Sequence, residues 1–186
     1  TFRLFAPQKA SVHLVASFNG WDPTSDSLQV DEHGMWRIEK QLPPGRHKYR
    51  FVVNPGAGRA TVTICDPYAF EVTRKMDHDE PQAAVVTAPV QPFQWQHEAA
   101  WVRRPLHELV IYEIHLLDFS PGGDVQGVID RLDYLHDLGV TAIELMPLGE
   151  FAGEDGGETS WGYDPMYFFA LHPAYGTPGD FKRLVD

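Results

Sequence analysis

The stretch LVIYEIHLLDF at residues 109–119, followed by RLDYLHDLGVTAIELMPL at residues 131–148, decides the fold of the second half of this chain. The first stretch predicts a buried strand over Leu109–Leu117, and the second ends in another over Val140–Met146. Strand, helix and strand in this order predict the opening of a parallel α/β unit, although two strands do not close a barrel. The intervening helix is predicted over Asp124–Leu138, with an apolar stripe and a closing glycine supplied by Val128, Ile129, Leu132, Leu135, Leu138 and Gly139.

A further helix is predicted at the end of the chain, after the string YGTPGDF at residues 175–181. Thr177 stands where an N-cap belongs, Pro178 suits the first turn, and Asp180 completes a capping box. The helical run Phe181–Asp186 then stops after about two turns. We therefore expect the sequence to be a piece of a larger protein.

The first half of the chain shows short apolar runs separated by turn residues, the pattern of an all-β, immunoglobulin-like sandwich. Residues 88–105 contain three prolines and two tryptophans without a sustained period, which indicates a linker. We assign residues 1–90 to the sandwich, 91–105 to the linker and 106–186 to the α/β unit. The predicted strands of the sandwich are Thr1–Ala6, Ser11–Ala16, Met35–Gln41, His47–Val53, Thr61–Ile64 and Ala83–Val86.

The composition excludes several classes of partner. The chain carries a formal net charge of −11, whereas nucleic acids and anionic membranes attract basic surfaces. No apolar run approaches the length of a membrane span, and no signal sequence is visible, although Thr1 enters a strand directly and leaves the compartment open, cytoplasmic or secreted. The single cysteine, Cys65, excludes an internal disulfide and a cysteine-based zinc site. We expect no nucleic-acid partner and no membrane partner, and a neutral polymer fits better.

One polar run offers atoms that bind metals. Residues 74–80 include Asp77, His78, Asp79 and Glu80. A solvated loop is the preferred interpretation, because nothing nearby completes a coordination shell. We therefore predict no metal and no cofactor.

The two stretches quoted first, together with SWGYDPMYFFALHPAYGTPGDFKRLVD at residues 160–186, resemble the start of the α-amylase superfamily of glycoside hydrolases. The resemblance implies a (β/α)8 TIM barrel that cleaves or transfers α-glucosidic bonds, present here only in part. TFRLFAP at 1–7, FNGWDP at 18–23 and LPPGRHKYRFVV at 42–53 are similar to carbohydrate-binding module family 48. The implied chain is multidomain, a β-sandwich followed by an incomplete barrel.

The resemblance carries one near-universal active-site residue of the family onto this chain: Tyr163, which stacks on the sugar ring at the cleavage point. A flat aromatic face suits the apolar C–H bonds of the ring and a developing oxocarbenium ion. A core tyrosine is the alternative. Trp161 and Asp164 are candidates for the same cleft, although Pro165 allows Asp164 a loop-shaping role instead. His115, near the end of the first barrel strand, is a further substrate-binding candidate, against the alternative of a structural histidine.

The same resemblance places the family's catalytic Asp, Glu and Asp after the fourth, fifth and seventh strands, all beyond Asp186. Glu113 and Glu144 are a tempting substitute, since glycoside hydrolysis requires two carboxylates. We reject them because they lie two or more residues short of the predicted strand ends, whereas barrel chemistry is placed at or beyond those ends. No catalytic residue and no activity are therefore expected of this chain alone.

In the sandwich, Trp21 and Arg50 occupy positions where binding members of the module place an aromatic and a cationic sugar contact. The second tryptophan expected near residues 54–60 is replaced by NPGAGRA. We therefore expect a weak carbohydrate surface, and a sandwich that only packs on the barrel is the alternative.

These implications favour the N-terminal piece of an amylase-like or debranching hydrolase, which hydrolyses O-glycosidic bonds in starch or glycogen-type substrates. A piece of a 1,4-α-glucan branching enzyme or of a trehalose-releasing hydrolase is an alternative. A non-catalytic glucan-binding module is an alternative of another class. The expected partner is an α-glucan polysaccharide or oligosaccharide.

Overall fold

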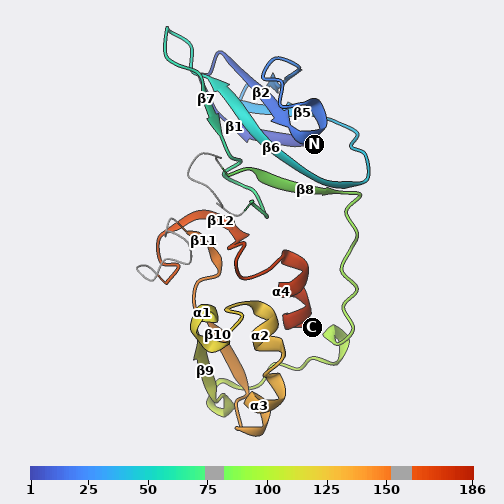
Figure 1. Cartoon of the computed structure of the whole chain (residues 1–186), viewed down its shortest axis with the longest axis vertical. Helices are drawn as coiled ribbons and strands as arrows, with labels where there is room; N and C mark the ends of the chain where they lie inside the picture. Colours follow the sequence, from blue (N-terminus) through green and yellow to red (C-terminus); the bar gives the residue numbers. More distant parts are fainter. Residues whose placement is uncertain (74–81, 152–160) are drawn as a thin grey trace. The chain divides into compact units, whose positions relative to one another are not determined.

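The computed structural model describes residues 1–73, 82–151 and 161–186 (Figure 1). These residues fall into two compact units, 1–90 and 91–186. The first unit consists of strands and one 3-10 turn, η1 (Ser17–Asn19), whereas the second mixes strands with short helices.

The first unit contains all six predicted strands, which confirms that its short apolar runs form β-strands. Two further strands, β3 and β4, have two residues each and are too short for periodicity to indicate them. One antiparallel sheet has the order β1-β5-β4, and the other has the order β3-β2-β6-β7 with β8 also paired to β6. The strands are β1 (Phe2–Phe5), β2 (Ser11–Ala16), β3 (Asp26–Ser27), β4 (Gln29–Val30), β5 (Met35–Ile38), β6 (Gly45–Asn54), β7 (Val62–Ile64) and β8 (Ala84–Ala88).

Side chains of both sheets build the core of the first unit. Phe2 of β1 meets Tyr49 of β6 with ring centroids 4.9 Å apart in an edge-to-face arrangement. Trp36 of β5 donates its indole N–H to the carbonyl oxygen of Ala6 at 2.8 Å, so its polar atom is satisfied inside the core. Each large apolar side chain buried in this way contributes about 1.5–3 kcal/mol. Further buried members are Leu4, Val12, Leu14, Phe51 and Val53.

The second unit begins with two 3-10 turns and then alternates strands and helices. β9 and β10 pair in parallel, as predicted, with Ala142 opposite Ile111 and Leu145 opposite Ile114. β11 and β12 form an antiparallel pair that the sequence analysis missed. The elements are η2 (Glu98–Ala100), η3 (Leu106–Glu108), β9 (Ile111–Ile114), α1 (Leu116–Phe119), α2 (Val125–Ile129), α3 (Leu132–Asp137), β10 (Ala142–Leu145), β11 (Gly149–Phe151), β12 (Pro165–Leu171) and α4 (Pro178–Val185).

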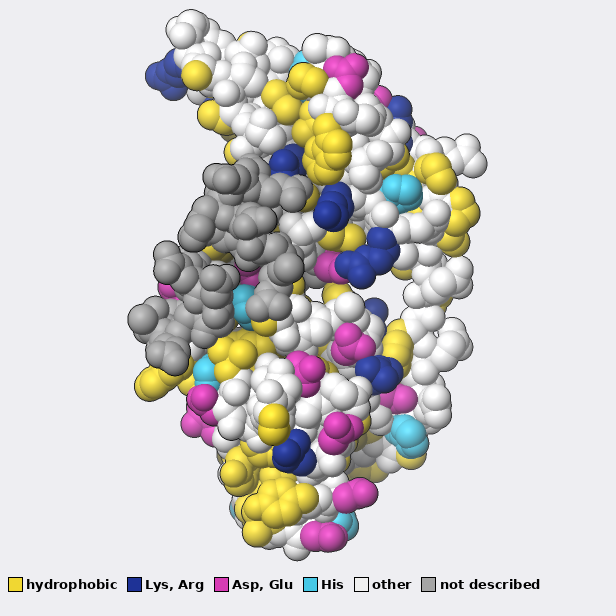
Figure 2. Space-filling view, in the orientation of Figure 1, with side chains coloured by type: hydrophobic (Ala, Val, Ile, Leu, Met, Phe, Trp, Pro, Cys, Tyr) yellow, Lys and Arg dark blue, Asp and Glu magenta, His cyan; other side chains and the backbone are white. Residues whose placement is uncertain are grey.

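The first strand of this unit is shorter and less buried than predicted. β9 ends at Ile114 because the chain turns into α1 at Leu116. Ile114 is buried, but Ile111 and Tyr112 are exposed, since β9 pairs only with β10 among the described residues. Hydrophobic side chains accordingly reach the surface where Figure 1 places β9 and α3 (Figure 2).

The predicted helix over residues 124–138 is two helices, α2 and α3, with a break at Asp130 and Arg131. Its start is confirmed, because Asp124 Oδ1 accepts a hydrogen bond from the Gly127 N–H at 2.9 Å. Its end is confirmed by Gly139, which has a φ of 93°. Leu138, which was predicted for the buried stripe, is 57% exposed, so this part of the prediction is wrong. The core of the unit contains Ile114, Leu116, Val125, Val128, Leu135, Phe151 and Tyr175.

Residues 91–105 belong to the second compact unit, where the N–H groups of Gln96 and His97 donate to Asp186 Oδ1 at 2.8 and 3.1 Å. Within the described ranges, no helix is long and apolar enough to cross a membrane. No group of three or more potential metal ligands occurs in that same part of the chain. The polar run with Asp77–Glu80 lies outside the described residues.

Candidate functional site

The loop that contains Tyr163 lies against the chain that leaves β10. Gly162 is buried and has a φ of 86°, and a Cβ atom built on it would lie 2.8 Å from the carbonyl oxygen of Pro147. Pro147 follows Leu145, the last residue of β10, by two positions. Because only glycine readily combines a left-handed backbone with so close an approach, the loop is fixed at this point.

The two aromatic side chains that flank Gly162 face solvent. Tyr163 is 64% exposed and Trp161 is 56% exposed, and Asp164 is exposed as well. Trp161 adopts a φ of 53°, which is uncommon for a bulky residue. The structure therefore presents the ring of Tyr163 at the surface of the second unit and does not bury it as a core residue.

His115 belongs to the same end of the parallel pair as this loop. The N–H of Met146 donates to the carbonyl oxygen of Ile114 at 2.9 Å, so the β9–β10 ladder reaches the residues directly before His115 and Pro147. Parallel strands end at one common edge, and in barrels this carboxyl edge carries the chemistry. The backbone thus brings His115 and the loop on Pro147 to one edge.

The imidazole of His115 is hydrogen-bonded at one of its two ring nitrogens. Its Nδ1 lies 2.7 Å from Asp118 Oδ2, within the turn of α1. Its buried Nε2 has no hydrogen-bond partner within the described residues. Asp118 thus orients the ring of His115, and a substrate-binding role of this histidine stays a prediction.

Glu113 and Glu144 lie directly opposite each other in the parallel register of β9 and β10. Both are exposed, and each precedes the last residue of its strand by one position, which is closer to the strand end than the sequence indicated. They still lie within the strands and not on the loops at the edge. The structure therefore does not join them to the Tyr163 loop.

A buried polar cluster at the β11–β12 pair was missed by the sequence analysis. His172 Nδ1 lies 2.5 Å from Glu150 Oε2, and the two residues are 7% and 4% exposed. Tyr175 packs edge-on against His172 with ring centroids 4.8 Å apart. Burial, and then the carboxylates of Asp118 and Glu150, raise the pKa of the Tyr175 hydroxyl. The only sequence signal was a glutamate and a histidine flanking apolar runs, which does not reveal that the two meet.

The two candidate sugar contacts of the first unit do come together. The guanidinium carbon of Arg50 lies 5.2 Å from the ring centroid of Trp21, a cation–π distance. Arg50 also donates from Nε to the carbonyl oxygen of Gln82 at 3.0 Å. Trp21 is 37% exposed, so part of its ring remains available to a ligand.

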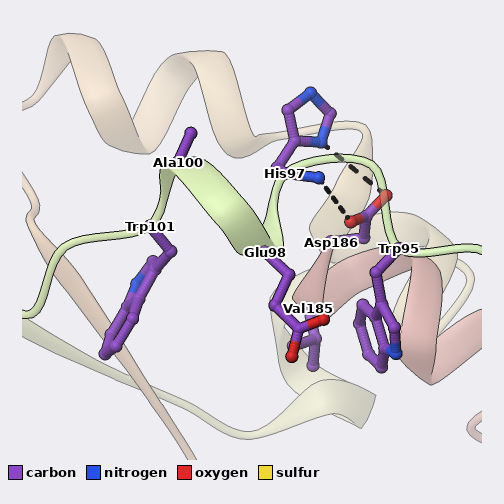
Figure 3. A pocket seen from close by; sticks show the side chains of 7 residues that line it. All are labelled: Trp95, His97, Glu98, Ala100, Trp101, Val185 and Asp186. Atoms are coloured by element: carbon purple, nitrogen blue, oxygen red, sulfur yellow. Dashed lines mark hydrogen bonds and ion pairs between the residues drawn. The ribbon is translucent and has the colours of Figure 1, made fainter.

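A groove of about 490 Å³ lies elsewhere in the second unit, and none of the predicted substrate-binding residues lines it. Figure 3 shows Glu98 between the indoles of Trp95 and Trp101, with Asp186 at the end of α4 next to His97. The backbone N–H of His97, followed by that of Gln96, holds the pKa of the Asp186 side chain below its ordinary value despite partial burial. The remaining lining residues are Ala100 and Val185.

Comparison with known families divides the chain in two. Residues 67–186 match the family model described as alpha amylase, catalytic domain. Residues 1–69 match carbohydrate-binding module 48, described as the isoamylase N-terminal domain.

Known proteins resemble the whole chain. The 1,4-alpha-glucan branching enzyme GlgB of Vibrio cholerae is 33% identical, and the match covers 100% of this chain and 26% of that protein. The malto-oligosyltrehalose trehalohydrolase of Saccharolobus solfataricus is 31% identical, with 100% and 30% covered. A crystal structure of a provisionally assigned alpha amylase from Salmonella typhimurium matches with a TM-score of 0.78 at 32% identity, over 99% of this chain and 28% of that one. The chain thus spans less than a third of the length of these proteins.

Proposed function

Because the chain belongs to the α-amylase family, with a carbohydrate-binding module 48 match in its first 69 residues, we propose that it forms the N-terminal part of an enzyme that acts on α-glucans. Its two family matches follow the order of the two compact units along the chain. In this proposal, residues 1–90 are the module, 91–105 are a linker and 106–186 open a (β/α)8 barrel. The parallel β9–β10 pair with helices α2 and α3 between its strands supports the barrel assignment.

The observation that carries the proposal is the exposed aromatic loop at the carboxyl edge of β9 and β10. Tyr163 offers a flat face to a sugar ring, and Gly162 fixes the backbone beneath it. Trp161 and Asp164 supply a second apolar face and a hydrogen-bond acceptor for hydroxyl groups. His115 lies at the same edge. Together these residues suit one sugar subsite of a longer cleft.

The reaction of the whole enzyme is proposed as cleavage or transfer of α-glucosidic bonds. Hydrolysis was favoured from the sequence, whereas the two relatives named above are a branching enzyme and a trehalohydrolase, the two alternatives considered. All three reactions use a pair of carboxylates flanking the bond. We assign those carboxylates to parts of the enzyme outside this chain, since Glu113 and Glu144 lie within strands. The chain by itself is then a binding piece without turnover.

A second candidate function is glucan binding by the first unit. The exposed ring of Trp21 under Arg50 is the observation that favours it. One such platform binds a sugar weakly, because stacking on a single aromatic ring is worth only about 1 kcal/mol. A sandwich that merely packs on the barrel predicts no binding at this ring.

Titration of the isotope-labelled 186-residue chain with maltoheptaose tests both sites. We expect NMR shift changes at Trp161 and Tyr163 and smaller ones at Trp21, with cellohexaose, a β-linked glucan, as the negative control. Tyr163→Ala should abolish the changes at the loop. Tyr134→Ala, which removes another exposed tyrosine from α3, should leave them intact. Shift changes at the loop that survive Tyr163→Ala would overturn the assignment of the subsite, whereas changes at Trp21 report on the first unit alone.

In the full-length enzyme, Tyr163→Ala should lower kcat/KM by the equivalent of about 1–3 kcal/mol of transition-state stabilisation and barely change Tm. The reason is that the ring contacts solvent in the free protein and sugar in the complex. Steady-state kinetics and thermal unfolding of the same variant provide the measurement. A core tyrosine would show the reverse pattern, with a stability loss of about 3–5 kcal/mol and unchanged kcat/KM.

A further inference from the structure

The β11–β12 pair that carries the aromatic loop has an irregular backbone ladder. Gly149 is opposite Leu171, Glu150 is opposite Tyr167, and Phe151 is opposite Pro165, so the register shifts twice within three residues of β11. Irregularities of this kind interrupt the backbone ladder locally. Side-chain contacts across the pair can then add to what the remaining backbone hydrogen bonds specify.

Glu150 and His172 supply a side-chain connection across this pair. Glu150 lies in the middle of β11 and His172 directly follows β12, and their 2.5 Å contact joins the strands across the irregular stretch. The backbone N–H of His172 also donates to the carbonyl oxygen of Leu148 at 2.8 Å. The side-chain contact and the backbone hydrogen bond thus both connect the C-terminal end of β12 to residues 148–150 in and next to β11.

The imidazole is itself held by packing. Phe151 stacks on His172 with ring centroids 4.5 Å apart and an interplanar angle of 28°. Tyr175 also contacts the imidazole, in an edge-to-face arrangement. The carbonyl oxygen of His172 accepts from Tyr175, whose own carbonyl oxygen accepts from Val125 at the start of α2. The connection is therefore anchored to the helices, and not only to the two strands.

A short path links this connection to the aromatic loop. Phe151 follows Glu150 and pairs with Pro165, the residue directly after Asp164. A displacement of Glu150 therefore moves the strand position that supports the loop. Tyr163 lies two residues before Pro165 and directly after Gly162. It is therefore flanked by the Phe151–Pro165 pair on one side and by the close approach of Gly162 to Pro147 on the other.

We propose that Glu150 and His172 are positioning residues that hold the β11–β12 pair in register and so set the place of the Tyr163 ring. The proposal rests on the sugar-binding role proposed for Tyr163. Both residues are buried, so we expect neither of them to touch substrate. A buried hydrogen-bonded pair adds little net stability, because desolvation offsets most of the gain, but it discriminates against misaligned arrangements that leave one polar partner unsatisfied.

The test uses the 186-residue chain labelled with 3-fluorotyrosine at its seven tyrosines. Tyr→Phe variants at 112, 134 and 163 assign the corresponding fluorine NMR lines. Replacing both Glu150 and His172 with leucine removes the connection without leaving a lone buried polar group, so the second unit stays folded. We expect the Tyr163 line of this double variant to shift or broaden, while the Tyr112 and Tyr134 lines keep their wild-type positions.

A conservative variant tests whether the hydrogen bond between residues 150 and 172 positions the loop, or whether any side chain of similar size is enough. Glu150→Gln keeps an oxygen that accepts from His172 Nδ1, and we expect it to restore the wild-type Tyr163 line. His136→Asn, at an exposed histidine of α3, is the matched control and should change nothing. The proposal is overturned if the double variant leaves the Tyr163 line unmoved, if all three lines shift together, or if Glu150→Gln behaves like the double variant.

This experiment is read without sugar. A failure of the chain to bind maltoheptaose would therefore contradict the proposed function and leave the positioning result readable. Conversely, an unmoved Tyr163 line with intact maltoheptaose binding would remove the positioning role alone.

Discussion

At Gly162 the aromatic loop lies against Pro147, two residues after the end of β10. A side chain there would meet the Pro147 carbonyl oxygen at 2.8 Å and would have to adopt a φ of 86°. Gly139 shares the left-handed backbone, with a φ of 93°, but a Cβ atom there would meet nothing within 4 Å. A substitution at Gly139 therefore incurs only the cost of the left-handed backbone, whereas one at Gly162 also incurs the cost of a steric collision.

We expect Gly139→Ala to destabilise the second unit by about 1 kcal/mol through its backbone conformation. Gly162→Ala should have the same cost plus roughly 1–3 kcal/mol for the collision with Pro147. Urea unfolding followed at the Tyr112 fluorine line reports on this unit alone. Gly162→Ala should also weaken maltoheptaose binding, whereas Gly139→Ala should not. Equal destabilisation by the two variants would mean that the loop relaxes freely away from Pro147.

Helix α4 shows how the local sequence defines an element. The hydroxyl and backbone N–H of Thr177 donate to Asp180 Oδ2 at 2.7 and 2.8 Å, and the Asp180 N–H in turn lies 3.2 Å from Thr177 Oγ1. The predicted capping box is thus confirmed, and Pro178 occupies the first turn. Thr177→Ala should cost about 1 kcal/mol of stability.

The same contacts predict a pH dependence. Hydrogen bonds from the Thr177 hydroxyl and backbone, supported by Arg183, hold the pKa of Asp180 below its ordinary value of 3.8. The folded chain therefore binds this proton less readily than the unfolded chain, so the stabilisation is complete above that value and is lost as the pH falls below it. Urea unfolding at about pH 6 and about pH 3 should show a smaller loss for Asp180→Asn than for wild type. Equal losses would contradict the contribution of this carboxylate.

At the scale of the whole molecule, the two units differ in how well their apolar surfaces are covered. Large hydrophobic side chains of the second unit remain exposed on β9, α3 and β12, among them Ile111, Tyr134, Leu138, Phe168 and Phe169. Strand edges and apolar faces without cover lower local stability. In the monomeric chain, we expect backbone amides of residues 1–73 to exchange with solvent deuterium more slowly than those of residues 109–151. Equal and strong protection in both ranges would mean that the second unit is complete without further barrel elements.

The chain is also expected to lack turnover. Purified protein should release no reducing sugar from soluble starch and should form no branches, whereas the full-length enzyme should do one or the other. Turnover by the chain that disappears in Glu113→Gln or Glu144→Gln would place the active site on β9 and β10 and overturn the assignment. Glu98→Gln, in the separate groove, is the matched control.

The sequence by itself determined the strands of the first unit, the parallel order of β9 and β10 and the start of α4. These features depend on local periodicity and cap chemistry, which act over a few neighbouring residues. It also singled out the WGYDP loop, although only through a family resemblance, and the structure then showed its aromatic rings at the surface.

Only the tertiary structure decided the β11–β12 pair, the contact between Glu150 and His172, and the exposure of β9. Glu150 and His172 are 22 residues apart, and no short-range pattern shows which distant side chains meet. The run Pro165–Leu171 is apolar without alternation, so its periodicity does not distinguish a strand from a helix, and pairing with β11 settles it. The burial of a strand depends likewise on the neighbours that cover it, which its own residues do not specify.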